Sequence, residues 1–343
     1  MKTIYSEQHR LRDAKTELHG GQLVTPFERP SRADTIIKAI GQSNLGDILE
    51  PETFAMDPVR AVHSDDFIAF LETAWQEWQD AGFTGEAIAS SWPARRMQSR
   101  LPDFIDGKIG YYALAAETSI TEGTWAAALA SKDVALTGAK ALLQGERGIF
   151  SLCRPPGHHA AIDMFGGYCF FNNAAIAAQY LLDQGAKRTA ILDIDFHHGN
   201  GTQDIFYDRD DVLFCSLHGD PQQAFPYFLG YADEAGSGEG LGYNLNYPMP
   251  RDTSFAQWQQ SLSAALAKIS AFVPQYLIVS LGVDTFENDP ISFFKLTTAD
   301  YFTTGAMIAE LRRPTLFVME GGYDIDEVGI NVVEVLKGFE SVK

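Results

Sequence analysis

The sequence predicts an α/β fold in which helices cover a mostly parallel sheet. From residue 148 onward, short apolar runs alternate with longer segments of helical character, as strands and crossover helices do in parallel sheets. The run TAILDIDF at residues 189–196 starts apolar and β-branched, which is typical of a strand buried on both faces. Unusual polar clusters follow the predicted strands, at the edge where open parallel sheets bind ligands.

The first half of the chain is less regular. Residues 3–5 are predicted to open the sheet, and the polar, glycine-containing residues 10–32 are predicted to form a loop. Residues 82–124 contain glycine, proline and paired arginines without a clear period, which indicates a long functional insertion. Ser64 is predicted to cap a helix, and Gly145 to end one. Apolar or Ala-rich helical patterns occur at residues 31–40, 64–80 and 124–143.

Strands and helices alternate in the second half. Strands are predicted at residues 148–153, 189–196, 212–217, 276–281 and 315–319. Helical segments are predicted at residues 173–184, 203–207, 253–272 and 298–312. Residues 199–201, Gly-Asn-Gly, are predicted to form a loop. The glycines of residues 236–242 lack a following Lys-Ser/Thr and are predicted to form a surface loop, not a phosphate cradle.

Composition limits the class of protein. A chain of 343 residues, 45% hydrophobic, can form one α/β domain with insertions. No apolar stretch reaches the roughly 18 residues of a membrane helix, and the N-terminus lacks a signal-peptide core. Cys153, Cys169 and Cys215 are scattered and odd in number, which predicts a reducing, cytoplasmic setting. The net charge of -19 argues against nucleic acid and membrane partners and would favour a cationic ligand, although solubility alone also explains it.

A divalent metal site is predicted at the end of the central strand. Asp193, Asp195 and His197 alternate along the chain, so their side chains should leave the same face. Buried carboxylates and an imidazole would be costly there without a cation, and oxygen and nitrogen donors suit zinc or a similar metal. Asp284, beyond the apolar run at residues 276–283, suits a third ligand. The plainer alternatives are a helix-capping or turn aspartate and surface histidines.

Two further motifs indicate catalysis. In RPPGHHA, prolines stiffen the loop that carries His158 and His159, and these tandem histidines are either ligands, proton-transfer groups or ordinary surface residues. Because the metal already has three candidate ligands, we assign His158 and His159 to proton transfer. In EGGY, two glycines allow a sharp turn that can aim the Tyr323 phenol at a developing oxyanion. The alternative is an aromatic ring packed over a glycine turn.

Five motifs carry a resemblance to a known family. They occur in the order RPPGHH, GGYCFFNN, DIDFHHGNGT, LGVDTFENDP and EGGY. This set resembles the zinc-dependent histone deacetylase family. The likeness extends through KTELHGG, GEAIAS, IDGKIGYY, AAETSI, HGDPQQAFPYFLGY and DPISFFKLT. Nearly the whole chain is therefore similar to the bacterial acetylpolyamine amidohydrolases of that family.

The resemblance implies an arginase/deacetylase-like fold. Three layers, with a mostly parallel eight-stranded sheet between helices, would form a single deacetylase domain over residues 1–343. An insertion loop at about residues 82–124 would shape the active-site entrance and a homodimer interface. One zinc ion per chain would be held by Asp195, His197 and Asp284, and would activate a water and polarise an amide carbonyl.

The resemblance also implies roles for the catalytic groups. His159 would take a proton from water and later protonate the leaving amine, while His158 assists electrostatically. Tyr323 would donate to the oxyanion. Asp193 would partner His158, and Asn200 would partner His159 where some family members carry Asp. A neutral amide should stabilise an imidazolium less than a carboxylate would, leaving His159 more readily neutral.

Potassium is a second cofactor that the resemblance implies, with one or two ions per chain. One ion would lie beside the zinc, held by Asp193, Asp195, His197 and the backbone of Ser216 and Leu217. A peripheral ion would lie near Phe206, Arg209, Val212 and Tyr243. The nearer ion would change the pKa values of the catalytic histidines through its charge.

The substrate channel is likewise assigned by resemblance. Tyr168 and Phe225 match the aromatic walls that hold an aliphatic chain, with Gly167 beside the first wall. Glu117 matches an acid that contacts a distal ammonium group. Asp106 stands where a Glu is expected, which shortens its reach. In polyamine-specific members, the insertion loop of one subunit narrows the active site of its dimer mate and excludes bulky protein substrates.

We therefore predict a zinc-dependent amidohydrolase that converts acetylated putrescine, cadaverine or spermidine-type amines to acetate and free amine. A deacetylase acting on acetyl-lysine in peptides or proteins would share the chemistry and differ only in access to the site. A non-catalytic metal-binding or polyamine-binding protein is the remaining alternative.

Overall fold

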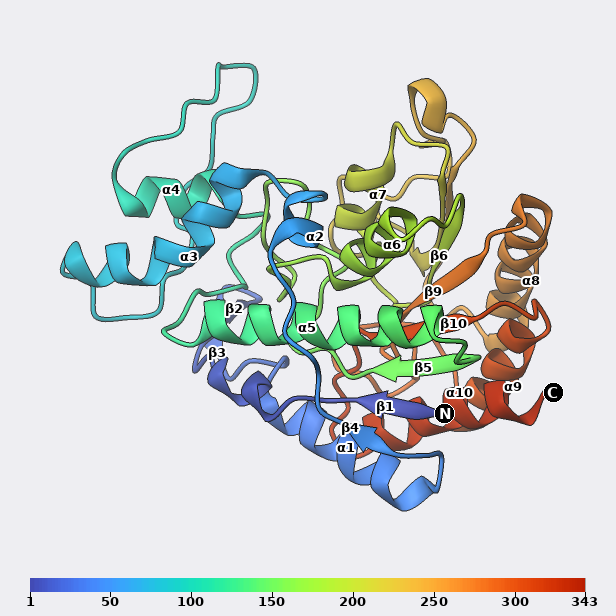
Figure 1. Cartoon of the computed structure of the whole chain (residues 1–343). Helices are drawn as coiled ribbons and strands as arrows, with labels where there is room; N and C mark the ends of the chain where they lie inside the picture. The colour runs from blue at the N-terminus through green and yellow to red at the C-terminus, as the bar shows by residue number, and fades with distance from the viewer. Residues whose placement is uncertain (343) are drawn as a thin grey trace.

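The computed structural model describes residues 1–342, which contain an eight-stranded sheet between helices (Figure 1). The strands are β1 (Lys2–Ile4), β4 (Ile48–Leu49), β5 (Gly148–Ser151), β6 (Thr189–Asp193), β7 (Val212–Gly219), β8 (Asn244–Met249), β9 (Tyr276–Leu281) and β10 (Thr315–Met319). Their order is β4-β1-β5-β10-β9-β6-β7-β8, and every neighbouring pair is parallel. The predicted α/β fold with an eight-stranded sheet is confirmed.

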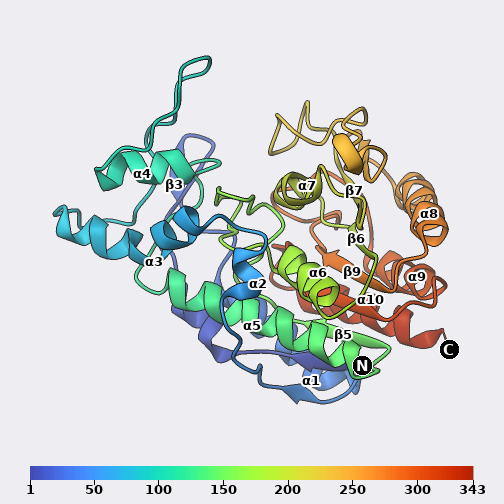
Figure 2. The same ribbon diagram turned by 45° about the horizontal axis from the view of Figure 1, so that its top comes forward.

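Helices cover both faces of this sheet. They are α1 (Pro30–Ser43), α2 (Asp57–Arg60), α5 (Thr124–Leu143), α6 (Asn173–Asp183), α7 (Asn200–Phe206), α8 (Phe255–Phe272), α9 (Thr298–Ala309) and α10 (Val328–Ser341). Helices α5, α6 and α7 lie over one face, and α1, α8, α9 and α10 lie over the other (Figures 1 and 2). None of the helices in the described residues is long and apolar enough to cross a membrane.

The strands have continuous apolar runs because each layer of helices buries alternate side chains. In β6, Ile191 belongs to the hydrophobic cluster under α5 and α6, whereas Ala190 and Leu192 belong to the cluster on the opposite face. In β10, Leu316 belongs to the cluster under α5 and α6, and Phe317 belongs to the cluster on the opposite face. Burial on both faces therefore explains why these strands could be recognised from the sequence.

Two N-terminal predictions are only partly right. The loop predicted at residues 10–32 contains a hairpin of β2 (Glu17–His19) and β3 (Gln22–Val24). Its turn is Gly20-Gly21, with φ of 56° and 79°, and glycine adopts these values at both central positions of a two-residue hairpin turn. Ser64 does precede α3 (Asp65–Asp80), but its side chain makes no capping hydrogen bond.

The insertion at residues 82–124 is not wholly irregular. Helix α4 (Ile105–Tyr112) lies within it, packed on α3 through Tyr112 and Phe70, whose rings stack with centroids 4.5 Å apart. Both helices stand away from the sheet, and the chain before α4 projects from the molecule (Figures 1 and 2). Trp92 fastens this projecting loop, since its Nε1 donates a hydrogen bond of 2.8 Å to the carbonyl of Ala113.

Three elements of the second half were missed or misjudged. The loop predicted at residues 199–201 is wrong, because α7 begins at Asn200 with Gly199 as N-cap. Strand β8 was not predicted, and its polar sequence NLNYPM, with a proline, suits an edge strand that is only partly buried. Helix α10 was also not predicted, because its run of valines has low helix propensity and resembles a strand.

Candidate active site

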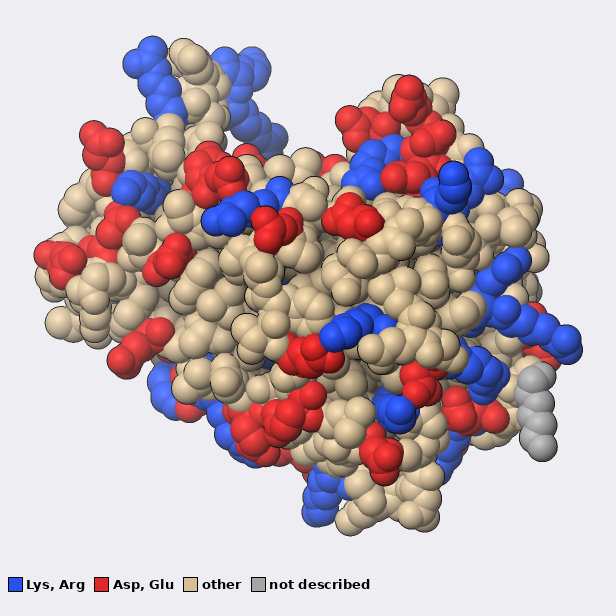
Figure 3. Space-filling view, viewed as in Figure 1, with Lys and Arg blue, Asp and Glu red and all other residues tan. Residues whose placement is uncertain are grey.

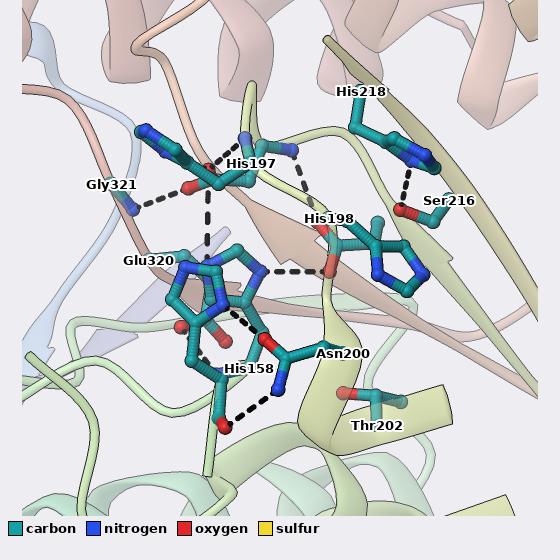
Figure 4. Close-up of polar contacts among 12 residues, drawn as sticks. His158, His197, His198, Asn200, Thr202, Ser216, His218, Glu320 and Gly321 are labelled. Atoms are coloured by element: carbon teal, nitrogen blue, oxygen red, sulfur yellow. Dashed lines mark hydrogen bonds and ion pairs between the residues drawn. The ribbon is translucent and has the colours of Figure 1, made fainter. Parts of the chain in front are cut away.

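The loops at the C-terminal edge of the sheet carry the site. They follow β5, β6, β9 and β10, and they bring together His158 and His159, Asp195 and His197, Asp284, and Tyr323. Figure 4 shows His158, from the segment after β5, converging with His197 and Asn200, which both follow β6. Strand β6 ends at Asp193, so Asp195 and His197 lie in the loop beyond the strand.

Asp195, His197 and Asp284 form a buried group suited to a metal ion. One ligand atom from each lies within 4.8 Å of the others. His197 Nδ1 is 3.2 Å from Asp195 Oδ1 and 3.0 Å from Asp284 Oδ2. Burial, together with the charge of Asp195, raises the pKa of Asp284 to about 6. Two carboxylates and an imidazole leave open coordination positions on zinc, so the residues present fit this metal.

Backbone N–H groups orient both carboxylates. Gly321 N donates to Asp195 Oδ2 at 2.7 Å (Figure 4), and Phe196 N donates to Asp284 Oδ1 at 2.7 Å. A Cβ on Gly321 would lie 2.5 Å from an oxygen of each aspartate, so a larger residue would displace the carboxylates. The EGGY turn therefore supports the metal-binding group as well as carrying Tyr323, a function that the sequence reasoning did not assign to it.

The two adjacent histidines have different partners. His158 Nδ1 lies 2.9 Å from Asp193 Oδ2, and His159 Nδ1 lies 2.6 Å from Asn200 Oδ1. Burial alone would lower the pKa of His158, but the nearby aspartates outweigh burial and raise it to about 10. Burial and the charges of neighbouring histidines lower the pKa of His159 well below its usual value. Of the pair, His159 lines the cavity.

Tyr323 is held by backbone and aromatic contacts. Its N–H donates to Asp289 Oδ2 at 2.7 Å, and the Arg32 guanidinium lies 4.7 Å from the centre of its ring. Arg32 also donates to the carbonyls of Gly322 and Glu320, each at 2.6 Å, and so fixes the turn before the tyrosine. Burial raises the pKa of the phenol well above its usual value, which keeps it protonated and able to donate.

A cavity of about 550 Å³ opens beside His159, His197 and Tyr323. The rings of Tyr168 and Phe225 also line it. The Phe225 ring stands edge-on to His159, with centroids 5.1 Å apart, and the Tyr168 ring is 5.7 Å from that of Tyr323. Both aromatic residues predicted to wall a channel are therefore next to the candidate catalytic groups.

Glu117 and Gly167 also line this cavity. Gly167 N donates to Glu117 Oε1 at 2.7 Å. Gly167 has a φ of 53°, and a Cβ at this position would overlap the His159 ring. Glycine is therefore required for the close approach between the loop and the histidine.

Asp106 does not join this group in the described chain. It lies in the first turn of α4, where its carboxylate accepts from Ser90 Oγ at 3.4 Å, and it does not line the cavity.

The residues assigned to potassium lie near the metal-binding group. Asp193 is in register with Ser216 on the neighbouring strand β7, and Leu217 follows. Ser216 Oγ is hydrogen-bonded to His218 Nδ1 at 2.8 Å (Figure 4). At the peripheral position, the Phe206 carbonyl accepts from Arg209 N at 3.1 Å. The Tyr243 carbonyl accepts from Phe214 N at 2.9 Å.

Three buried carboxylates at the site were not predicted: Glu17, Asp289 and Glu320. Glu320 accepts from Gly157 N at 2.6 Å and His158 N at 3.1 Å, and so links the loops after β5 and β10. Asp289 accepts from Ile291 N at 3.0 Å as well as from Tyr323 N. Asp289 and Glu320 stand in the motifs LGVDTFENDP and EGGY, so a signal was present in the sequence.

Residues 26–339 match the family described as Histone deacetylase domain, and the chain belongs to this family. Membership implies a zinc cofactor, which the donor set fits. Among relatives, the chain is 58% identical over 338 residues to an acetylpolyamine amidohydrolase of Mycoplana ramosa, covering 98% of this chain and 99% of that protein.

A second relative and a solved structure support the same family assignment. Acetylpolyamine amidohydrolase 2 of Pseudomonas aeruginosa is 56% identical over 342 residues, covering 100% of this chain and 99% of that protein. The crystal structure of an acetylpolyamine aminohydrolase from Burkholderia pseudomallei matches with a TM-score of 0.94 and 38% identity, covering 100% of this chain and 99% of that chain. The predicted family resemblance is confirmed.

Proposed function

We propose that the protein is a zinc-dependent amidohydrolase that removes the acetyl group from N-acetylated polyamines. Acetylputrescine, acetylcadaverine and acetylspermidine are the substrate types, and acetate and free amine are the products. The observation that carries the proposal is one cavity lined by His159, His197 and Tyr323 and also by the carboxylates of Glu17 and Glu117. The activity named for the relatives above supports the same substrate class.

The chain's own residues account for the proton transfers. When bound by Asp195, His197 and Asp284, zinc would polarise the amide carbonyl and lower the pKa of the attacking water. His159 Nδ1 is hydrogen-bonded to Asn200 Oδ1, so Nε2 is the atom free to accept the proton of that water. The same nitrogen then delivers the proton to the leaving amine.

The remaining groups stabilise the charge that develops. Tyr323 would donate its phenol proton in a hydrogen bond to the carbonyl oxygen as that oxygen gains negative charge. His158, fixed by Asp193, would add positive charge near the same atoms without entering the cavity. Tyr168 and Phe225 would hold the methylene chain between their rings, with Gly167 leaving room beside His159. Glu117 would attract the distal ammonium group.

Potassium would be a structural cofactor, with one or two ions per chain. The inner ion would use Asp193, Asp195 and His197 with the carbonyls of Ser216 and Leu217. Asp193 is the last residue of β6, and Ser216 and Leu217 lie on the adjacent parallel strand β7. The outer ion would use carbonyls at Phe206, Arg209, Val212 and Tyr243. Hydrogen bonds already made by the carbonyls of Phe206 and Tyr243 leave each with one further lone pair.

We also propose that residues 1–343 act as a single domain within a homodimer. The insertion at about residues 82–124 would shape the entrance of the partner's active site, bringing Asp106 to its distal end. Large apolar side chains are exposed on this insertion, among them Trp92, Met97, Leu101 and Phe104. Arginines gather at the tip of the projecting loop (Figure 3), whereas the chain as a whole is acidic. Three unpaired, buried cysteines support a reducing, cytoplasmic location.

A substrate panel tests the proposed function. Zinc-loaded protein is assayed with acetylputrescine, acetylcadaverine, acetylspermidine and an acetyl-lysine peptide. We expect kcat/KM to be at least about tenfold higher for the acetylated amines than for the peptide, because the entrance excludes bulky chains. A preference for the peptide would instead indicate a lysine deacetylase, and zinc binding without release of any amine would indicate a binding protein.

Variants assign the chemistry in the same assay. Tyr323→Phe should lower kcat by about 100-fold to 1000-fold, the usual cost of losing one oxyanion donor, while zinc content is unchanged. Tyr180→Phe on α6 is the control, because it removes a phenol hydroxyl remote from the cavity. Near-normal turnover by Tyr323→Phe would remove that residue from its role.

A further inference from the structure

A second carboxylate lies in the cavity wall, and the reaction chemistry does not use it. Glu17 is the first residue of β2, it is 2% exposed, and it lines the cavity. Its Oε1 accepts a hydrogen bond from the Tyr168 hydroxyl at 2.9 Å, and its Oε2 accepts one from Phe27 N at 3.1 Å. The N-terminal hairpin is thereby joined to the aromatic wall of the channel.

Tyr168 is held at both ends. Its backbone has a φ of 68°, and its N–H donates to Thr118 Oγ1 at 2.8 Å. The preceding N–H, of Gly167, donates to Glu117 Oε1. Glu17 therefore fixes the hydroxyl end of the ring, and Glu117 fixes the backbone end. The two acids lie on the same wall of the cavity, one at each end of Tyr168.

Glu17 also lacks the cationic partner that a buried carboxylate normally has. Buried Glu28 forms ion pairs with Arg32 at 3.1 Å and Arg154 at 2.7 Å. Across residues 1–342, no Lys or Arg forms an ion pair with Glu17. Burial, with smaller contributions from Glu117 and Glu28, raises the pKa of Glu17 to about 7. A buried acid that faces a cavity without a counter-ion favours a cationic ligand in that cavity.

We propose that Glu17 is a specificity-determining residue, which fixes the Tyr168 hydroxyl and attracts an ammonium group carried on the substrate chain. The inference rests on the proposed function and adds a second acid to its recognition site. Glu17 and Glu117 would together favour a chain with a protonated nitrogen over a neutral chain of equal length.

The test compares a cationic substrate with a neutral one of the same length. Acetylputrescine carries a terminal ammonium group, and N-pentylacetamide replaces it with a methyl group. Assays at about pH 8 keep most of Glu17 ionised. Glu17→Gln should lower kcat/KM for acetylputrescine by about tenfold but that for N-pentylacetamide by less than about threefold. Glu17→Asp keeps the charge and should retain the preference for acetylputrescine.

Two controls separate charge from anchoring. Glu86 holds the same hairpin segment, since its carboxylate accepts from Lys15 N at 2.6 Å and Thr16 N at 3.0 Å, but it does not line the cavity. Glu86→Gln should leave the ratio of the two kcat/KM values within about twofold of wild type. Tyr168→Phe removes the hydrogen bond to Glu17 and leaves the charge, so it should lower kcat/KM for both substrates by a similar factor.

The outcomes are distinguishable. Suppose that the wild type hydrolyses acetylputrescine, but that Glu17→Gln lowers kcat/KM for both substrates equally or changes it for neither. The specificity role of Glu17 is then wrong, while the proposed function stands. If Glu86→Gln lost the preference for acetylputrescine over N-pentylacetamide to the same extent, the specificity role of Glu17 would also be wrong, because the effect would then come from a displaced hairpin. If wild type hydrolyses neither acetylated amine, the proposed function fails and the inference that rests on it fails too.

Discussion

The two adjacent histidines, His158 and His159, have different hydrogen-bond partners and favour different protonation states. His158 is paired with the carboxylate of Asp193, and His159 with the neutral amide of Asn200. The carboxylates favour the protonated form of His158, whereas burial favours the neutral form of His159. A cation held by Asp195 would weaken the negative potential at His158, but it would not change which histidine faces the cavity. The neutral, cavity-facing residue is the one suited to accept a proton.

Glu17 should make substrate preference depend on pH. Its carboxylate is neutral below a pKa of about 7 and charged above it, so attraction for an ammonium group should appear as pH rises. Glu17 accepts hydrogen bonds from the Tyr168 hydroxyl and Phe27 N, and the charges that act on it most strongly are the carboxylates of Glu117 and Glu28. The ratio of kcat/KM for acetylputrescine to that for N-pentylacetamide should increase several-fold between about pH 6 and 8.

This ratio cancels the titration of the catalytic groups, because both substrates undergo the same reaction. The substrate's own amine, with a pKa of about 10, stays charged throughout. In Glu17→Gln the ratio should be flat over the same range. A ratio that rises equally in the variant would show that another group is responsible for the pH dependence.

At the level of elements, the turn after β10 connects three parts of the site. Its first glycine, Gly321, contacts the metal-binding aspartates, and its tyrosine faces the cavity. Asp289, after β9, accepts from the N–H of Tyr323 and so connects this turn to the neighbouring loop. A backbone shift in this turn would therefore move a candidate metal ligand and the proposed oxyanion donor together.

Gly321→Ala tests this connection. The added Cβ would overlap the carboxylates of Asp195 and Asp284, so zinc affinity should fall by about tenfold or more, along with kcat. Isothermal titration of the metal-free protein with zinc measures the affinity directly. Gly41→Ala in α1 is the control, since its Cβ would meet no atom within 4 Å and should leave zinc binding unchanged. Normal zinc affinity in Gly321→Ala would contradict the support assigned to the turn.

The sequence predicted the elements that are buried on both faces and the residues that follow them. Strands β9 and β10 and helix α5 have the predicted boundaries, because their apolar patterns are continuous. Asp284 and Tyr323 could be placed at the site because they directly follow such strands. Glu17 could not, since it is 151 residues from Tyr168 and lies in a short polar hairpin. Neither pattern nor spacing reveals a contact of that range.

At the scale of the whole molecule, charge is unevenly distributed. The chain has a net charge of -19, yet the projecting part of the insertion carries Arg95, Arg96 and Arg100, all exposed. Figure 3 shows this basic tip standing apart from the mixed and acidic surface of the body. A basic, apolar loop on an acidic protein is complementary to a second copy of the same chain. The site of one copy would then be completed by the loop of the other.

Charged substitutions in the insertion test the proposed dimer. Met97 is 72% exposed and Phe104 is 58% exposed, so Met97→Asp with Phe104→Asp should not disturb the fold. Burying two carboxylates in an apolar interface is unfavourable, and the double variant should run as a monomer on a sizing column with light scattering. Its selectivity for acetylputrescine over an acetyl-lysine peptide should fall by about tenfold, because the entrance is wider.

Val273→Asp, at the exposed end of α8, is the control and should leave both the oligomeric state and the selectivity unchanged. A wild-type monomer, or a double variant that stays dimeric, would contradict the role of the insertion in dimer formation. A monomeric double variant with unchanged selectivity would show that the dimer does not determine which substrate is accepted.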